Sequence, residues 1–151
     1  MFSKPENGWT DVEVFGKYIG SASYAWDVPF DTADALLRWL HGKPLDLAFD
    51  AEGSWFGLAT ICGRLYAFWS DIGGDNAKIE QLATDLPSAA IAKQLAQECI
   101  ADLAAYLDGW AIWMGDTGQD ADDRKQRLVQ KIAELSEALE KLEHRTPALS
   151  P

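Results

Sequence analysis

Cysteine and histidine are both scarce in this chain. Among its 151 residues the only cysteines are Cys62 and Cys99, and the only histidines are His41 and His144. The two cysteines lie far apart and form no C-x-x-C pair, which argues against a disulfide framework or a zinc site built on paired thiolates. We therefore expect both cysteines as small buried hydrophobic residues in a reducing compartment. Both histidines lie near the ends of predicted helices, where helix capping explains them better than acid–base catalysis does.

Basic residues and long apolar runs are also missing. Asp and Glu number 24 against 13 Lys and Arg, which gives a net charge of −11. Phosphate contacts need clustered positive charge, so the composition disfavours nucleic acid and favours a basic or neutral protein partner. No segment reaches the roughly 18 consecutive apolar residues of a membrane span, and residues 1–11 lack the pattern of a secretory signal. We expect a cytoplasmic protein without membrane contact.

Catalytic motifs are absent as well. The chain has no G-x-S-x-G sequence, and Gly73-Gly74 is not followed by the Lys-Ser/Thr pair of a phosphate-binding loop. The acidic segment 116–123 does not match the spacing of a calcium loop, and helix capping explains it without a metal. We therefore expect no enzymatic activity, no cofactor and no bound metal.

Tryptophan, in contrast, is abundant, with seven residues in the chain. Core filling explains many individual tryptophans, because burial removes a large apolar surface from water. Aromatic anchors inside a charged rim are also typical of protein-binding hot spots, and an acidic field steers a basic partner towards them. Each tryptophan therefore belongs either to the core or to a binding surface.

The hydrophobic pattern predicts a mostly antiparallel sheet over the first half of the chain. Val12 and Val14 alternate with acidic residues, which is typical of a half-buried strand. The predicted strands are 9–15, 18–24, 45–49, 55–61, 65–69 and a short edge strand at 78–82. A helix capped by Asp31 or Thr32 and ending at Gly42 interrupts them and must cover the sheet.

A long amphipathic helix follows from Pro87 or Ser88 and forms the second cover of the sheet. Its apolar positions recur at helical spacing: Ile91, Leu95, Ile100, Leu103 and Leu107. The segment 108–114 that ends this helix is too apolar for ordinary surface. It either closes the core or forms a contact patch.

The C-terminal region 123–144 has a heptad pattern over about three repeats. Apolar residues occupy the seam: Leu128, Ile132, Leu135, Leu139 and Leu142. Two interpretations remain open. The helix packs as an antiparallel hairpin partner on the preceding helix, or it forms an arm for dimerisation or target binding.

Together these patterns predict an α+β protein. We expect a mostly antiparallel sheet of five or six strands packed by two helices, with the heptad-patterned helix attached. The expected organisation is an α+β domain over residues 1–115, a C-terminal helix over 116–145 and a flexible tail over 146–151.

Three segments carry a resemblance to a known class of proteins: FSKPENGWT, GSASYAWDVP and FDAEGSWF. Between Phe2 and Trp69 the chain resembles the N-terminal half of small bacterial immunity proteins of polymorphic toxins. The resemblance rests on the spacing of turns and aromatic residues and leaves the last two helices unmatched. It implies an acidic protein without enzymatic activity that plugs the active site of one cognate toxin.

The predicted role is therefore inhibition by tight stoichiometric binding of a protein. Five acidic residues would supply the charge: Asp46, Asp50, Glu52, Asp71 and Asp75. Four tryptophans are the candidate anchors: Trp55, Trp69, Trp110 and Trp113. Four of these carboxylates could form a general acid–base pair only if they converged: Asp46, Asp50, Glu52 and Asp71. A solvated strand face is the more economical interpretation.

Other functions remain possible on the sequence alone. An adaptor or oligomeric structural protein would use the seam from Leu128 to Leu142 to form a homodimer. A phage-encoded inhibitor of a bacterial defence protein would need the same acidic and aromatic surface. A small-ligand protein or enzyme would need a pocket, for which Tyr24, Trp26 and Trp39 are the candidate lining residues.

Overall fold

The computed structural model describes residues 1–23, 26–71, 73–82, 88–112 and 118–145. Six strands and four helices lie in these ranges. The α+β class and the antiparallel pairing of the strands are confirmed. The expected domain boundary near residue 115, the tail from residue 146, Tyr24 and Trp113 lie outside the described residues.

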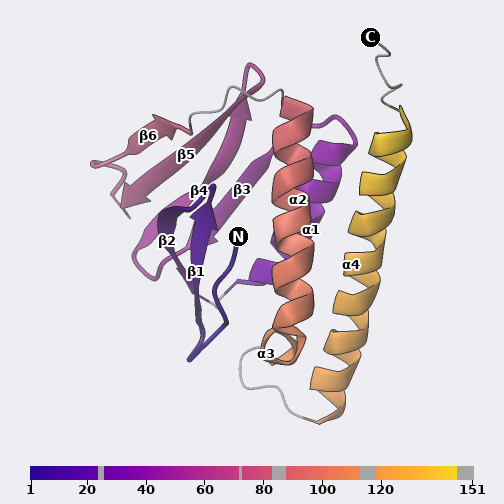
Figure 1. Ribbon diagram of the computed structural model, residues 1–151. Helices are drawn as coiled ribbons and strands as arrows, with labels where there is room; N and C mark the ends of the chain where they lie inside the picture. The colour runs from indigo at the N-terminus through magenta and orange to yellow at the C-terminus, as the bar shows by residue number, and fades with distance from the viewer. Residues whose placement is uncertain (24–25, 72, 83–87, 113–117, 146–151) are drawn as a thin grey trace.

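The strands form two sheets instead of the single sheet expected. The first sheet is a hairpin of β1 (Trp9–Val14) and β2 (Lys17–Ser23). The second sheet has four strands in the order β3 (Asp46–Asp50), β4 (Ser54–Ile61), β5 (Arg64–Asp71) and β6 (Lys78–Gln81). The hairpin packs against β3 and β4 without joining their ladder (Figure 1).

The close approach of the two sheets depends on a glycine in β2. A Cβ atom at Gly20 would lie only 2.9 Å from the ring of Phe56 on β4. That ring therefore packs directly on the backbone of the hairpin, because glycine leaves room for it. Phe56 also stacks on Phe49 of β3, with ring centroids 5.1 Å apart.

The alternating pattern of the four-stranded sheet divides its side chains between two faces. Leu47, Phe49, Leu58 and Leu65 are buried on the face towards the hairpin and helices. Trp55 points to the opposite face, because it neighbours Phe56 along β4. A two-residue turn of Cys62 and Gly63 joins β4 to β5, and both residues have positive φ, as a tight hairpin requires.

The expectation that both cysteines are buried is half wrong. Cys99 is buried, but Cys62 is exposed in the turn between β4 and β5. The turn conformation decides its place, since a side chain at the tip of a hairpin projects into solvent.

The helices pack beside one another against the sheets (Figure 1). Their bounds are α1 (Val28–Leu40), α2 (Ser88–Ala105), α3 (Leu107–Ala111) and α4 (Gln119–Arg145). Helix α1 begins at Val28, earlier than the expected cap at Asp31 or Thr32, because Pro29 is well tolerated in a first helical turn. It ends before Gly42, as expected, with φ of +84° at that glycine.

Helix α4 belongs to the same hydrophobic core as the rest of the chain. Leu128 and Leu135 are fully buried and Leu139 is nearly so, and the helix packs against α1, α2 and α3. The heptad seam is therefore used within one chain. This packing agrees with the hairpin interpretation, and it leaves Leu128 and Leu135 without a surface for a second chain. Oligomerisation of the protein stays a prediction.

A buried arginine fastens the start of α4 to the start of α1. The Arg124 guanidinium donates from Nη1 to Asp27 Oδ2 at 3.0 Å and from Nη2 to Asp27 Oδ1 at 2.5 Å. Its Nε also donates to the carbonyl oxygen of Trp110 at 3.2 Å, and the group lies 5.0 Å from the Phe30 ring centroid. These contacts tie three helices together at one end of the bundle.

Candidate functional site

Most of the predicted binding residues gather at one end of the four-stranded sheet. Ser54 pairs with Asp71, so the β3–β4 turn and the β5–β6 loop lie at the same end. Six of the nine predicted residues belong to this loop end: Asp50, Glu52, Trp55, Trp69, Asp71 and Asp75. Figure 1 shows this end at the left of the view.

An exposed pair of indoles lies at the loop end. The rings of Trp26 and Trp55 meet edge to face, with centroids 5.5 Å apart and an interplanar angle of 68°. Trp26 is 51% exposed and Trp55 is 36% exposed. The Trp26 Nε1 donates to Asp50 Oδ2 at 2.8 Å, which holds the ring in place. An exposed aromatic pair of this kind is a typical anchor for a partner.

Trp26 is a site residue that the anchor prediction missed. It precedes α1 along the chain, so no strand pattern links it to Trp55. Only the long-range contact with Trp55 and the hydrogen bond to Asp50 assign it to this surface. The aromatic segment GSASYAWDVP was a signal for it, although spacing alone could not say what Trp26 would face.

A pocket of about 460 Å³ opens between the hairpin and the loop end of the sheet, and we call it the hairpin–sheet pocket. Trp9 and Tyr18 come from the hairpin wall, and Trp55 and Trp69 come from the sheet wall. The polar side chains in its lining are Ser21, Ser54, Ser70, Asp71 and Asn76. The pocket is therefore largely aromatic and has a carboxylate in its lining.

Trp69 is held against the hairpin and already carries a cation. Its Nε1 donates to the carbonyl oxygen of Ile19 at 2.7 Å, so the ring is half-buried between the two sheets. Lys78 places its Nζ 4.9 Å from the centroid of the ring. Such a contact is a cation–π interaction, which shows that this indole accepts a positive group.

The Asp71 carboxylate is kept ionised by the β5–β6 loop. The side-chain amide of Asn76 donates to Asp71 Oδ2 at 2.6 Å, and this hydrogen bond is the main cause of a lowered pKa for Asp71. Backbone amides of Asn76, Asp75 and Gly74 lower the pKa further. The loop therefore organises itself around a fixed negative charge.

The carboxylates of the loop end lack cationic partners within the described residues. Asp50 accepts hydrogen bonds from Trp26 and from the backbone N–H of Glu52, and Glu52 accepts one from the Ser23 hydroxyl at 2.7 Å. Asp71 is bound by the Asn76 amide. Each of these partners is neutral, so the negative charge is uncompensated locally.

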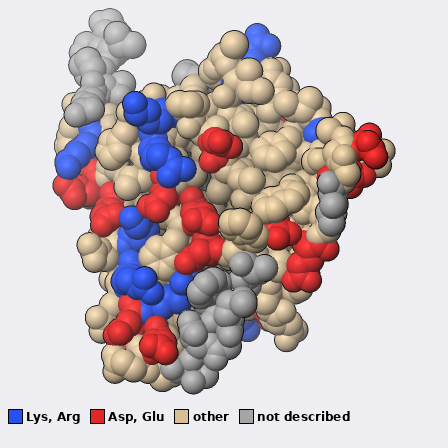
Figure 2. Space-filling model, turned by 180° about the vertical axis from the view of Figure 1, so that it is seen from behind, with Lys and Arg blue, Asp and Glu red and all other residues tan. Residues whose placement is uncertain are grey.

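The surface charge differs between the two halves of the molecule. Figure 2 shows the molecule from behind, with the sheet on the right and the helices on the left. Over the helices, basic and acidic groups are mixed. Over the sheet, a largely uncharged area is bordered mainly by acidic groups. Such an area suits a partner with apolar contacts and positive charge.

Three predicted residues do not join the loop end. Asp46 pairs with Ala59 near the other end of β3. Trp110 is fully buried and packs edge to face on Phe2 with centroids 5.4 Å apart, so its assignment as a binding anchor is wrong. The helical stripe of α2 continues into α3, and this places Trp110 in the core. Trp113 lies outside the described residues.

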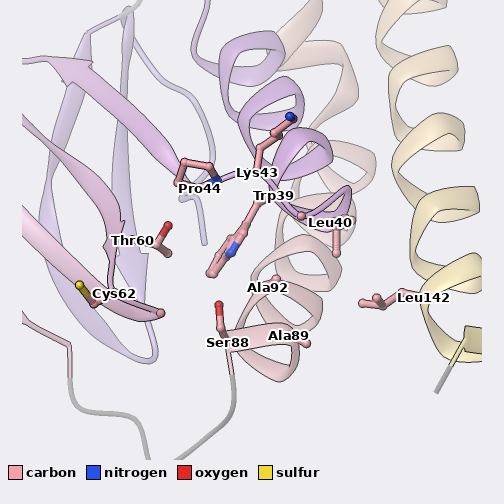
Figure 3. A pocket seen from close by; sticks show the side chains of 12 residues that line it. Trp39, Leu40, Lys43, Pro44, Thr60, Cys62, Ser88, Ala89, Ala92 and Leu142 are labelled. Carbon is pink, nitrogen blue, oxygen red and sulfur yellow. The ribbon is translucent and has the colours of Figure 1, made fainter. Parts of the chain in front are cut away.

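A second pocket of about 390 Å³ lies at the opposite end of the sheet (Figure 3). Trp39, Pro44, Cys62 and Ala92 are among its lining residues. The sticks in Figure 3 show Lys43 pointing away from the Trp39 ring and Thr60 on the sheet side. The Thr60 hydroxyl accepts the backbone N–H of Leu45 at 2.7 Å and is engaged in the fold.

A small-ligand protein or enzyme would need Trp26 and Trp39 to line one pocket. They lie apart, because Trp26 contacts Trp55 at the loop end and Trp39 lines the second pocket at the other end. Tyr24 is outside the described residues. The expected aromatic pocket of that alternative is therefore not formed by these two residues.

Reactive groups are sparse in the part of the chain that the structure describes. Burial raises the pKa of the Cys99 thiol to about 12, so this thiol stays protonated at neutral pH. No group of three or more His, Cys, Asp or Glu residues within the described ranges could hold a metal ion. The chemistry offered at the loop end is recognition through aromatic faces and negative charge.

Comparison of the chain with protein-family models, curated proteins and solved structures gives no match. Among the described helices, none combines the length and the apolar character that crossing a bilayer requires.

Proposed function

We propose that this chain is a non-enzymatic, acidic binding protein that neutralises one cognate protein by stoichiometric binding at the loop end of its sheet. The observation that carries the proposal is the exposed Trp26–Trp55 pair beside the Asp50 carboxylate. Two large aromatic rings in solvent are costly unless a partner covers them. Their fixed geometry also reduces the entropy that binding must overcome.

The charge of the surface supports a basic partner. The chain carries a net charge of −11, and Asp50, Glu52 and Asp71 have neutral hydrogen-bond partners instead of cations. A complementary positive surface would gain attraction on approach, which raises the association rate. Enzymes that act on nucleic acids have such basic clefts, since they hold phosphates.

The resemblance to bacterial immunity proteins supports a toxin as the partner. Two of its segments contribute directly to the loop end: GSASYAWDVP contains Trp26, and FDAEGSWF contains Asp50, Glu52 and Trp55. The surface most suited to binding therefore coincides with the segments that carry the resemblance. An adaptor function through the heptad seam has less support, because Leu128 and Leu135 are buried within the chain.

The test is capture followed by neutralisation in the native host. The wild-type chain should capture a basic protein that inhibits growth when expressed alone and loses this effect when the chain is co-expressed. A double variant, Trp26→Ala with Trp55→Ala, should lose both capture and protection. Asp46→Asn, at the other end of β3, is the matched control and should retain both.

Two results would overturn the proposal. The first is a double variant that protects cells as well as the wild type. The second is a captured protein that is harmless alone, or that is degraded or chemically altered by the chain instead of being bound.

A further inference from the structure

The hairpin–sheet pocket combines three features that select a planar cation. Trp9 and Trp69 are among its lining residues, and the Trp69 ring reaches the hairpin, where its Nε1 donates to the carbonyl oxygen of Ile19. Its lining includes the Asp71 carboxylate, which the β5–β6 loop holds in place. Its volume of about 460 Å³ is sufficient for one long side chain.

Lys78 already forms a cation–π contact with one of the pocket tryptophans, Trp69. Its Nζ lies 4.9 Å from the Trp69 ring centroid, and Lys78 is not among the residues that line the pocket. Both Lys78 and Lys17 form ion pairs with Glu80. The nearby basic groups are therefore paired with an acid on β6, and Asp71 has no ion pair among the described residues.

Resting on the proposed function, we infer that the partner inserts an arginine side chain into the hairpin–sheet pocket. Its guanidinium group would stack on the indole of Trp9 or Trp69 and lie in the field of Asp71. The hydrogen bonds from Asn76 occupy part of the Asp71 carboxylate, so charge attraction contributes more than a bidentate pair. The Trp26–Trp55 pair then covers apolar surface of the partner at the same end of the sheet.

Arginine fits this pocket better than other side chains do. A guanidinium is planar and weakly hydrated, so it stacks on an aromatic face at a lower desolvation cost than an ammonium. An apolar side chain would bring the Asp71 charge into an interface without compensation, which is unfavourable. An acidic side chain would be repelled.

The test uses N-acetylarginine amide as the probe and N-acetylcitrulline amide as its uncharged isostere. Indole N–H signals in two-dimensional ¹H–¹⁵N NMR report on the pocket and, through Trp39 and Trp110, on the rest of the fold. The arginine probe should shift the signals of Trp9 and Trp69 and leave those of Trp39 and Trp110 in place. We expect about fivefold weaker binding of the citrulline probe, as for loss of a cation–π contact.

Two variants separate a binding role from a structural one. Trp9→Leu removes a ring of the hairpin wall and should weaken arginine binding while the Trp110 signal stays in place. Asp71→Asn should weaken binding of arginine but leave binding of citrulline unchanged. Equal affinity for the two probes, or equal affinity of the arginine probe for wild type and both variants, would overturn the inference.

The failure of this inference can be told apart from failure of the proposed function. If the arginine probe does not bind but the Trp26→Ala, Trp55→Ala variant still loses its captured partner, the arginine inference is wrong and the binding surface stands. If that variant keeps its partner, the proposed function itself is wrong.

Discussion

The helical half of the molecule and the loop end of its sheet use the same residue types in opposite ways. In the helical half, Trp39 and Trp110 are buried and charged groups are paired across elements. Lys131 of α4, for example, lies 2.9 Å from Asp34 of α1. At the loop end, Trp26 and Trp55 are exposed and the carboxylates have neutral partners. The contrast indicates that the helices stabilise the fold and that the loop end is built for a partner.

The largest expected effect comes from removing core contacts of α4. Leu135→Ala leaves a cavity under a fully buried side chain and should lower the free energy of unfolding by about 3 kcal/mol. Urea denaturation measures this change. Val129→Ala, at an exposed position of the same helix, should change it by less than about 0.5 kcal/mol. Equal effects at both positions would mean that α4 does not pack on the core.

Breaking the buried ion pair should have the next largest effect. Arg124→Met leaves Asp27 without its bidentate partner and should cost about 2 kcal/mol of stability, since Asp27 retains some contact with water. Lys141→Met removes an exposed pair with Glu137 on α4 and should cost less than about 0.5 kcal/mol. Thermal unfolding of the two variants compares these costs. Equal melting temperatures would contradict the role of Arg124 as a link between helices.

Substitutions of the exposed indoles should affect stability least among the aromatic residues. Trp55→Ala removes a ring that is 36% exposed and should lower the free energy of unfolding by about 1 kcal/mol. Trp110→Ala removes a fully buried ring and should cost about 3 kcal/mol or more. Denaturation curves of Trp55→Ala and Trp110→Ala measure the two losses of stability, one at the loop end and one in the core. A larger loss for Trp55→Ala would show that its ring is part of the core.

The smallest predicted effect is a pH dependence from Asp71. Its folded-state pKa is lowered from the ordinary value of 3.8, mainly by the Asn76 side-chain amide. The hydrogen bonds to ionised Asp71 therefore stabilise the fold fully at pH values above the ordinary pKa of 3.8. This stabilisation is lost as the pH falls through the lower folded-state pKa. Asp71→Asn should reduce stability at neutral pH, and the difference from wild type should shrink in acid. A constant difference across this pH range would contradict the assignment.

The sequence predicted the local elements better than their assembly. Alternation and turn residues placed all six strands within about two residues of their observed bounds, as at β4 (Ser54–Ile61). The division into two sheets was not predicted, because alternation does not specify which strands pair. It depends on long-range contacts such as that of Gly20 with Phe56.

The heptad seam shows the same limit. Leu128 and Leu135 were predicted to face another helix, and they do. The spacing could not decide whether that helix belongs to the same chain, because intrachain and interchain seams bury equivalent surfaces. The packing of α4 on α1 and α2 decides it.

The candidate site was predictable in part. Trp55, Asp50 and Glu52 lie in one hairpin, so their proximity follows from the turn between β3 and β4. Trp110 was placed wrongly, because an apolar segment after a helix can close a core or form a surface with the same composition. Trp26 was missed as an anchor because its contact with Trp55 spans 29 positions of the chain, which no local pattern encodes.

Calorimetric titration of the captured partner into wild type and Trp55→Ala measures what the exposed indoles contribute to binding. We expect one partner per chain and an affinity about 30-fold lower for the variant, as for an anchor worth about 2 kcal/mol. The melting temperature of the variant, measured alongside, should fall by only about 2–4 °C, in line with a stability loss of about 1 kcal/mol. Unchanged affinity of Trp55→Ala for a partner that the wild type binds tightly would contradict the claim that the exposed indoles of the loop end hold that partner.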